Sequence, residues 1–263
     1  MPSSAALRLK IESDLHHRYP SALTPAARTI REVSATGIPA IDELLHGGLP
    51  VGAISELTGP ASSGRTTIAL AFLAGRTNDG SVCAWVDAGD AFDPESAAAN
   101  GVSLNHLLWV RCTNEPDKKP PPPHNPFQKK SQPWTRLDQA IRATDLLLQA
   151  GGFAAIVLDL AEEAIEHGRR IPLATWFRYR QAADRTRCSL VVLGRAPYAQ
   201  SSAAIVLECR PDRIDAANQN VIREFSYNAQ RSRERSTPLF SISRKPPAST
   251  WSAPASWQLE KRA

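Results

Sequence analysis

Nine consecutive residues carry the pattern of a phosphate-binding loop. They read Gly59-Pro60-Ala61-Ser62-Ser63-Gly64-Arg65-Thr66-Thr67 and match G-x-x-x-x-G-K-[ST], except that arginine takes the lysine position. In such a loop the glycines let backbone N–H groups curl around a phosphate, and the next helix directs its N-terminus at the anion. The hydroxyl of Thr66 can then ligate Mg²⁺. Residues 59–67 therefore predict a binding site for ATP and Mg²⁺.

Arg65 is the departure from the pattern. Lysine offers a compact ammonium to the terminal phosphates, whereas the guanidinium group is longer, planar and forked. The exchange is not conservative at a packed site. We expect the loop to retain binding better than turnover.

A carboxylate that could order the water shell of Mg²⁺ follows further along the chain. Residues 153–159 form an apolar run that ends on Asp159, as a buried strand that closes on a metal-ordering carboxylate would do. An aspartate at a strand end can instead cap a helix. Because a phosphate-loop pattern precedes it, we favour the metal role, and Thr66 and Asp159 are the predicted metal ligands.

The elements that must position these residues alternate between strand and helix, which is typical of an α/β fold with a mostly parallel sheet flanked by helices. A Gly/Ser-rich turn between a strand and a helix also occurs without a ligand, but few such turns meet the loop spacing. The predicted strands are 53–58, 82–86, 107–110, 153–159, 190–193 and 203–207, and the predicted helices are 66–74, 136–150 and 172–187.

The composition suits one compact domain with appendages. The chain has 263 residues, of which 42% are hydrophobic. No apolar run is long enough to cross a bilayer and the first residues lack a secretory pattern, so a cytoplasmic location without membrane association is expected. The four cysteines show no C-x-x-C pair. Cys83, Cys188 and Cys209 lie in or beside apolar runs, which favours buried reduced thiols, and the fourth is Cys112.

Three segments differ in character from the core at 31–245. Residues 1–30 are predicted to be a mainly helical leader. Residues 114–134, rich in proline and lysine, are predicted to be an exposed insertion within the core. Residues 246–263 are predicted to be a flexible tail, in which Trp251 and Trp257 could dock on a partner or on the chain's own domain.

The formal net charge of +5 is modest, but residues 223–245 hold a local basic excess. Such a cluster can neutralise the phosphates of single-stranded DNA, and a solvated basic surface explains it equally well. The predicted DNA contacts are Arg223, Arg231, Arg233, Arg235 and Arg244.

Three stretches carry a resemblance to a known family. Residues 36–52, the loop at 59–67 and residues 86–94 resemble the RecA recombinases, and the similarity runs from about residue 30 to residue 245. The short length and the leader containing residues 22–25 are most similar to ImuA-type proteins, bacterial accessory factors of damage-induced (SOS) translesion synthesis. The resemblance implies a RecA-like P-loop fold with antiparallel strands toward the C-terminal end. It also implies RecA or a translesion polymerase-like factor as partners, and homo-oligomers.

Comparison by position with that family shows what is altered. The catalytic glutamate that activates the attacking water is matched by Gly89, so no catalytic residue is assigned. The neighbouring Asp90 would point elsewhere. The adenine-contacting aspartate is matched by Asp93, whereas the base-stacking tyrosine is matched by Ser96. Base affinity should therefore be weakened.

The two DNA-facing loops of the family are also altered in this sequence. The loop after residue 193 is short, which leaves little room for strand exchange. The loop at 160–171 carries Glu162, Glu163 and Glu166 ahead of its arginines, and carboxylates repel a phosphate backbone.

Three functions remain open. We favour a RecA-like nucleotide-binding adaptor in bacterial DNA repair with a degenerate ATPase site. The second is a slow DNA-dependent ATPase and recombinase in which Arg65 and Asp90 compensate for the missing parts. The third is a protein scaffold whose loop binds no nucleotide.

Overall fold

The computed structural model describes residues 32–113, 135–217, 221–234 and 246–254. All of them belong to one compact unit, Glu32–Ala263. The predicted leader at 1–30 and the predicted insertion at 114–134 lie outside the described residues.

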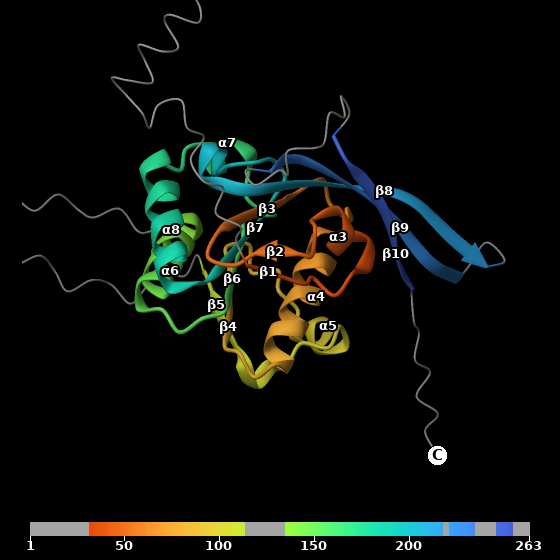
Figure 1. Ribbon diagram of the computed structural model, residues 1–263, viewed down its shortest axis with the longest axis horizontal. Helices are drawn as coiled ribbons and strands as arrows, with labels where there is room; N and C mark the ends of the chain where they lie inside the picture. The colour runs from red at the N-terminus through yellow and green to blue at the C-terminus, as the bar shows by residue number, and fades with distance from the viewer. Residues whose placement is uncertain (1–31, 114–134, 218–220, 235–245, 255–263) are drawn as a thin grey trace, which may run out of the picture. The chain divides into compact units, whose positions relative to one another are not determined.

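A mixed sheet forms the centre of this unit (Figure 1). Within the described ranges it has eight strands in the order β10-β9-β8-β3-β7-β6-β4-β5. The strands from β8 to β5 in this order are parallel to their neighbours, and β8, β9 and β10 pair antiparallel. They are β3 Ile54–Thr58, β4 Cys83–Asp87, β5 Leu107–Arg111, β6 Ala155–Asp159, β7 Ser189–Gly194, β8 Ala203–Ala217, β9 Val221–Glu234 and β10 Ala248–Pro254. The predicted fold class is confirmed.

Helices cover both faces of the sheet, and a small antiparallel pair of strands stands apart from it. The pair is β1 Val33–Ser34 with β2 Leu49–Pro50. The helices are α3 Pro39–Leu44, α4 Arg65–Asn78, α5 Pro94–Ala99, α6 Arg136–Ala150, α7 Ile165–Arg169 and α8 Leu173–Thr186, with short 3₁₀ turns at Leu104–His106 and Gln200–Ser202.

The buried strands supply two hydrophobic clusters because successive side chains point to opposite faces of a sheet. On β6, Val157 joins the cluster that contains α4, whereas Ile156 and Leu158 join the cluster that contains α6 and α8. Asp159 and Asp87 lie two residues beyond strand positions that face α4, so they lie on the same face of the sheet, and they are register partners on neighbouring strands. The sheet therefore brings two carboxylates to the face that carries the phosphate-loop helix.

Local sequence fixes the ends of α6 where they were predicted. Thr135 and Asp138 form a reciprocal capping box at its start, and Gly151 follows its last residue with φ 71°. The strand β8 is longer than predicted, since it continues to Ala217 as one arm of a long antiparallel pair with β9.

The segment Ala248–Pro254 differs from the flexible tail predicted for 246–263. It forms β10, which pairs with β9 so that Trp251 lies opposite Tyr227. Trp251 is only 6% exposed and belongs to the α4 cluster, and its ring stacks on Tyr227 with centroids 4.6 Å apart. An apolar anchor of this size orders a segment whose composition alone favours disorder. Residues 255–263, with Trp257, lie outside the described residues.

Two further predictions concern the thiols and the membrane. All four cysteines are free and buried, as predicted for Cys83, Cys188 and Cys209. Burial raises the pKa of Cys83 and Cys112 to about 11 and that of Cys188 and Cys209 to about 12, which keeps the thiols protonated. Within the described ranges, no helix has the length and apolar character that crossing a membrane requires.

Candidate nucleotide site

The loop at 59–67 connects β3 to α4, the setting that phosphate binding requires. Gly59 donates its N–H to the carbonyl of Gly194 at 3.1 Å, which ties the loop to the end of β7. A Cβ added at Gly59 would lie 2.2 Å from the carbonyl oxygen of Cys209, so only glycine fits there. Gly64 begins α4 with φ 83°, a left-handed conformation that glycine adopts without strain.

The side chain of Arg65 bends back over its own loop. It is 6% exposed, and its Nη1 donates to the carbonyls of Gly59 and Pro60, the latter at 2.8 Å. Burial lowers the pKa of Arg65, and the charges of Asp159 and Glu162 counteract that effect. A contact between this guanidinium and a bound phosphate would have to compete with the loop carbonyls.

Aromatic side chains from the C-terminal strands cover the start of α4. A Cβ added at Gly64 would lie 2.7 Å from Cζ2 of Trp251 and 3.0 Å from the ring of Tyr227. Thr66, the predicted metal ligand of the loop, remains exposed, and Thr67 is half-buried. The loop is therefore packed against β9 and β10 at Gly64 and open at Thr66.

Asp159 ends β6 at the same carboxyl edge of the sheet. It is 8% exposed, and its Oδ1 accepts the N–H of Ala161 at 2.9 Å. Burial raises the pKa of Asp159 to about 6, and the nearby carboxylate of Asp87 contributes in the same direction, whereas the positive charge of Arg65 opposes it. A buried carboxylate with little compensation is suited to a cation, so the residue fits the predicted metal role.

The described residues contain no group of three or more His, Cys, Asp or Glu side chains that could hold a metal ion by themselves. Mg²⁺ is commonly bound by one or two carboxylates together with substrate phosphates. Thr66 and Asp159 suit that mode, in which the nucleotide brings the remaining ligands.

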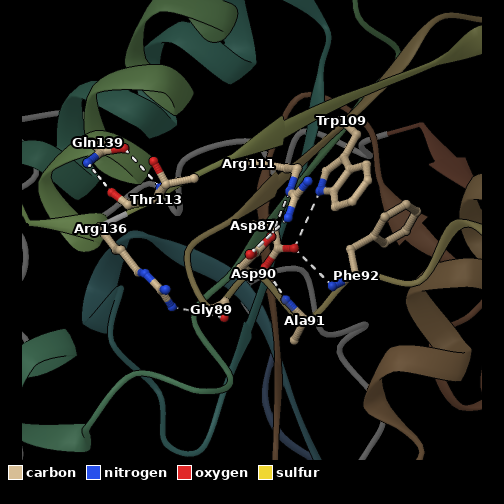
Figure 2. A network of polar contacts seen from close by, with 10 residues as sticks. All are labelled: Asp87, Gly89, Asp90, Ala91, Phe92, Trp109, Arg111, Thr113, Arg136 and Gln139. Carbon is tan, nitrogen blue, oxygen red and sulfur yellow. Dashed lines mark hydrogen bonds and ion pairs between the residues drawn. The ribbon is translucent and has the colours of Figure 1, made fainter. Parts of the chain in front are cut away.

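Asp87 organises the turn that follows β4 (Figure 2). Its carboxylate accepts the N–H of Ala91 at 3.0 Å, the N–H of Phe92 at 2.9 Å and the indole N–H of Trp109 at 3.3 Å. Phe92 packs against Trp109, with ring centroids 5.3 Å apart. Arg136 donates to the carbonyl of Gly89 at 3.2 Å. The turn at Gly89 is thus held from both sides.

Asp90 points away from the phosphate loop, as predicted. Its carboxylate forms a two-point ion pair with Arg111 at 2.8 and 3.0 Å, and Arg111 ends β5 at the far edge of the sheet from β3 (Figure 2). The hydrogen bond from Arg111 lowers the pKa of Asp90. The direction is set by a left-handed turn with φ 56° at Asp90 rather than by extended chain.

Asp93 caps α5. Its carboxylate accepts the N–H groups of Glu95 and Ser96, each at 3.2 Å, and the hydroxyl of Ser96 at 2.5 Å. The hydroxyl of Ser96 is the main cause of the lowered pKa of Asp93. The adenine contact assigned to Asp93 stays a prediction, and a base would have to share this carboxylate with the helix cap.

Glu162 lies beside the candidate site, although the sequence reasoning assigned it to a DNA-facing loop. It follows Asp159 at the end of β6 and lies against Gly89. Its Oε2 lies 3.6 Å from Nη2 of Arg195, which follows β7 and donates from Nε to the carbonyl of Ala161 at 2.9 Å. Its place three residues beyond Asp159, at the same strand end, was the available signal.

The loops expected to face DNA are tied to each other. Tyr198 and Ala199 donate their backbone N–H groups to Oε1 of Glu56, which is fully buried, at 2.6 and 2.9 Å. The ring of Tyr198 fills the space beside Gly168 and Gly194, where an added Cβ would lie 2.5 and 2.6 Å from it. Neither segment resembles a long loop free to enter DNA.

The loop at 160–171 lines part of a cavity of about 620 Å³. Its lining includes Arg136 and Arg170 as well as Glu163 and His167, the last two 3.5 Å apart. Mixed charge of this kind does not favour a phosphate backbone, which agrees with the carboxylates noted in the sequence.

The predicted DNA-binding arginines are only partly described. Arg231 lies on β9 with 7% exposure, and its N–H donates to the carbonyl of Pro247 at 2.9 Å. That burial does not suit a phosphate contact at the surface. Arg223 and Arg233 also lie on β9, where only their backbone is described, and Arg235 and Arg244 lie outside the described residues. For these four arginines the role stays a prediction.

Comparison with known proteins relates the first half of this chain to the RecA proteins. The family model of the RecA N-terminal domain matches residues 20–118. Protein RecA of Ruegeria pomeroyi is 39% identical over 129 residues, which cover 49% of this chain and 31% of the relative. Protein RecA of Crocosphaera subtropica is 48% identical over 86 residues, which cover 33% of this chain and 25% of the relative. The matches thus span a third or less of these relatives and support a RecA-like relationship.

A solved structure extends the likeness in fold. The crystal structure of the RadB recombinase superposes with a TM-score of 0.53 at 19% sequence identity, covering 82% of this chain and 93% of that one. At this identity the likeness concerns the fold alone. Together with the sheet order, it establishes a RecA-like architecture that extends beyond the residues matched in sequence.

Proposed function

We propose that this RecA-like chain is a nucleotide-binding accessory protein of bacterial DNA repair, acting in damage-induced (SOS) translesion synthesis, with a degenerate ATPase site. One observation carries the proposal. The phosphate loop keeps the glycine conformations and the strand–loop–helix setting of a binding site, whereas the turn after β4 offers only Gly89 where water would be activated.

The expected ligand is ATP with Mg²⁺. The backbone N–H groups of the loop and the N-terminus of α4 would hold the phosphates. Thr66 and Asp159 would contribute to the metal site, where Mg²⁺ supplies charge stabilisation. Turnover is expected to be slow, because Arg65 is engaged with the loop carbonyls and Gly89 has no side chain to polarise water.

An adaptor role fits the packing of the two loops that were expected to face DNA. Strand exchange requires loops that reach into DNA, and here the Tyr198 ring links the segments around Gly168 and Gly194. The partners we propose are RecA or a translesion polymerase-like factor, with single-stranded DNA and a second copy of the chain as further possibilities in the bacterial cytoplasm. Any DNA contact would be salt-sensitive and independent of sequence.

The test is an equilibrium titration of a fluorescent ATP analogue with and without Mg²⁺, followed by a phosphate-release assay with and without single-stranded DNA. We expect Mg²⁺-dependent binding and phosphate release far below that of a RecA protein assayed in parallel. Release at RecA-like rates, stimulated by DNA, would contradict the proposal and favour the recombinase. The ion pair of Asp90 with Arg111 speaks against that alternative, since it keeps Asp90 from compensating.

A protein scaffold that binds no nucleotide is the second candidate. The hydrogen bonds from Arg65 to Gly59 and Pro60 favour it, because they use the cation that would otherwise meet phosphate. Absence of binding in the same titration, by a protein that unfolds cooperatively, would select the scaffold.

A further inference from the structure

This inference rests on the function proposed above. Hydrolysis of ATP at this site requires a carboxylate that activates the attacking water, and none has been assigned so far. Three neighbouring carboxylates already have partners. Asp87 holds the turn after β4, Asp90 is paired with Arg111, and Asp159 is assigned to the metal. A fourth carboxylate, Glu162, lies at the same edge of the sheet and next to Gly89.

The side chain of Glu162 occupies the space next to Gly89. A Cβ added at Gly89 would lie 2.8 Å from Cβ and 3.0 Å from Cγ of Glu162. A larger residue at position 89 and the present Glu162 therefore exclude each other. We propose that Glu162 supplies, from the end of β6, the water-activating carboxylate that the turn after β4 lacks.

The charges around Glu162 fit this role. Its negative charge acts on both Arg65 of the loop and Asp159, so these groups lie within electrostatic reach of one another. The side chain is 55% exposed and therefore accessible to water. The order of strands in the sheet explains why Glu162, Arg65 and Asp159 lie close together, because β3, β7, β6 and β4 are neighbours and each ends at this edge.

Arg195 holds Glu162 in a loose ion pair, with 3.6 Å between Nη2 and Oε2. Arg195 also donates to the carbonyl of Ala161, and its charge acts on Arg65, so it is a second cation close to the phosphate loop. A terminal phosphate of ATP would compete for that cation and leave the carboxylate of Glu162 free to accept a proton.

The reaction would be hydrolysis of ATP to ADP and inorganic phosphate. The oxygen of a water molecule forms a bond to the γ-phosphorus while the carboxylate of Glu162 accepts one of its protons. The bond from the γ-phosphorus to the bridging oxygen breaks, and its electron pair leaves with ADP. The proton on Glu162 then passes to solvent or to the released phosphate.

The first experiment is single-turnover hydrolysis of ATP by full-length Glu162→Gln, with enzyme in excess, beside titration of the fluorescent ATP analogue. Loss of a general base predicts a rate lower by about 100-fold or more. Affinity for the analogue should stay within about twofold, since an uncharged isostere leaves the cradle intact. Glu163→Gln is the matched control, because Glu163 pairs with His167 instead and should retain the wild-type rate.

The outcomes separate this inference from the proposed function. An unchanged rate in Glu162→Gln overturns the inference and leaves nucleotide binding in place. A wild type that binds the analogue but shows no hydrolysis above a protein-free blank also overturns it. A wild type that does not bind the analogue overturns the proposed function, and the inference with it.

The second experiment moves the carboxylate. Gly89→Glu alone should not raise the single-turnover rate, because its Cβ meets the side chain of Glu162. Gly89→Glu combined with Glu162→Gly removes both Cβ and Cγ at position 162 and should hydrolyse ATP at least as fast as wild type. Thermal unfolding of both variants establishes that they fold. A rate in Gly89→Glu equal to that of the double variant would show that the two positions do not share one space, and would contradict the inference.

Discussion

Two regions of this protein meet at Gly64. The parallel strands β3, β7, β6 and β4 carry the phosphate loop and the carboxylates, and their ends follow recognisable local patterns. The antiparallel strands β9 and β10 carry no such pattern, yet Trp251 and Tyr227 pack on the start of α4. A motif can therefore reveal a phosphate loop while the residues that cover it come from a part of the chain where the sequence is least informative.

The two regions also differ in how they contribute to the free energy of unfolding. At the parallel edge the buried charges of Asp159 and Arg65 are kept at a cost in desolvation, which is typical of functional sites. At the antiparallel edge the contribution is apolar burial. Variants at each edge should therefore move stability in opposite directions.

The largest effect is expected from Trp251→Ala. It empties a buried position in the α4 cluster and should lower the free energy of unfolding by about 3–5 kcal/mol. For a domain of this size the midpoint of thermal unfolding should fall by about 10 °C. Ser252→Ala, an exposed position on the same strand, is the control. Equal midpoints for the two variants would mean that β10 is dispensable, as a flexible tail would be.

Gly64→Ala acts where the regions touch. It forces alanine into a left-handed conformation at about 1–2 kcal/mol, and crowding against Trp251 adds about 1–3 kcal/mol. Only the second contribution should disappear when the change is made in a Trp251→Ala background. Chemical unfolding of the four proteins of this double-mutant cycle measures the coupling. Strict additivity would show that Trp251 does not cover the loop.

Asp159→Asn should stabilise the protein. The folded-state pKa of about 6 exceeds the ordinary 3.8, so the ionised form is penalised in the folded protein above about pH 6. At about 1.4 kcal/mol per pKa unit, the variant should gain about 2–3 kcal/mol at pH 8. The gain should shrink as the pH falls through 6 and vanish near 4, where wild-type Asp159 is protonated. Unfolding curves at several pH values test this, and a gain that is constant with pH would contradict it.

The smallest effect is expected from Asp90→Asn, because asparagine tolerates the left-handed conformation at position 90 as aspartate does. The pair with Arg111 is partly exposed at the far edge of the sheet, so its loss should barely change the unfolding midpoint or the single-turnover rate. The same assays applied to Asp90→Asn and Glu162→Gln compare the two carboxylates directly. A larger loss of rate in Asp90→Asn would place the water-activating group after β4 instead of after β6.

The sequence predicts the parallel half of the fold well because its signals are local. The loop at 59–67, the capping residues Thr135 and Gly151 and the apolar run up to Asp159 each determine structure within a few residues. The strand β10 could not be predicted in this way, because its order depends on the contact of Trp251 with Tyr227 and Gly64, far away in the sequence.

The residues of the candidate site also fall into a group that the sequence predicts and a group that it does not. The phosphate loop and Asp159 are recognised from their spacing in the sequence. The parallel pairing of β3 with β7 and of β7 with β6 brings their strand ends to one edge of the sheet. Three other features could not be predicted, because they depend on how side chains pack between strands whose order in the sheet the sequence does not reveal. They are the hydrogen bonds of Arg65 to its own loop, the burial of Arg231 and the position of Glu162 beside Gly89.

The most direct test of the central claim is the titration of a fluorescent ATP analogue with wild type and Thr66→Ala, each with and without Mg²⁺. We predict saturable binding to wild type that Mg²⁺ strengthens, and binding to Thr66→Ala that Mg²⁺ no longer strengthens. The exposed hydroxyl of Thr66 is the predicted metal ligand of the loop, and the backbone cradle does not depend on it. Failure of folded wild-type protein to bind the analogue under either condition would contradict the account.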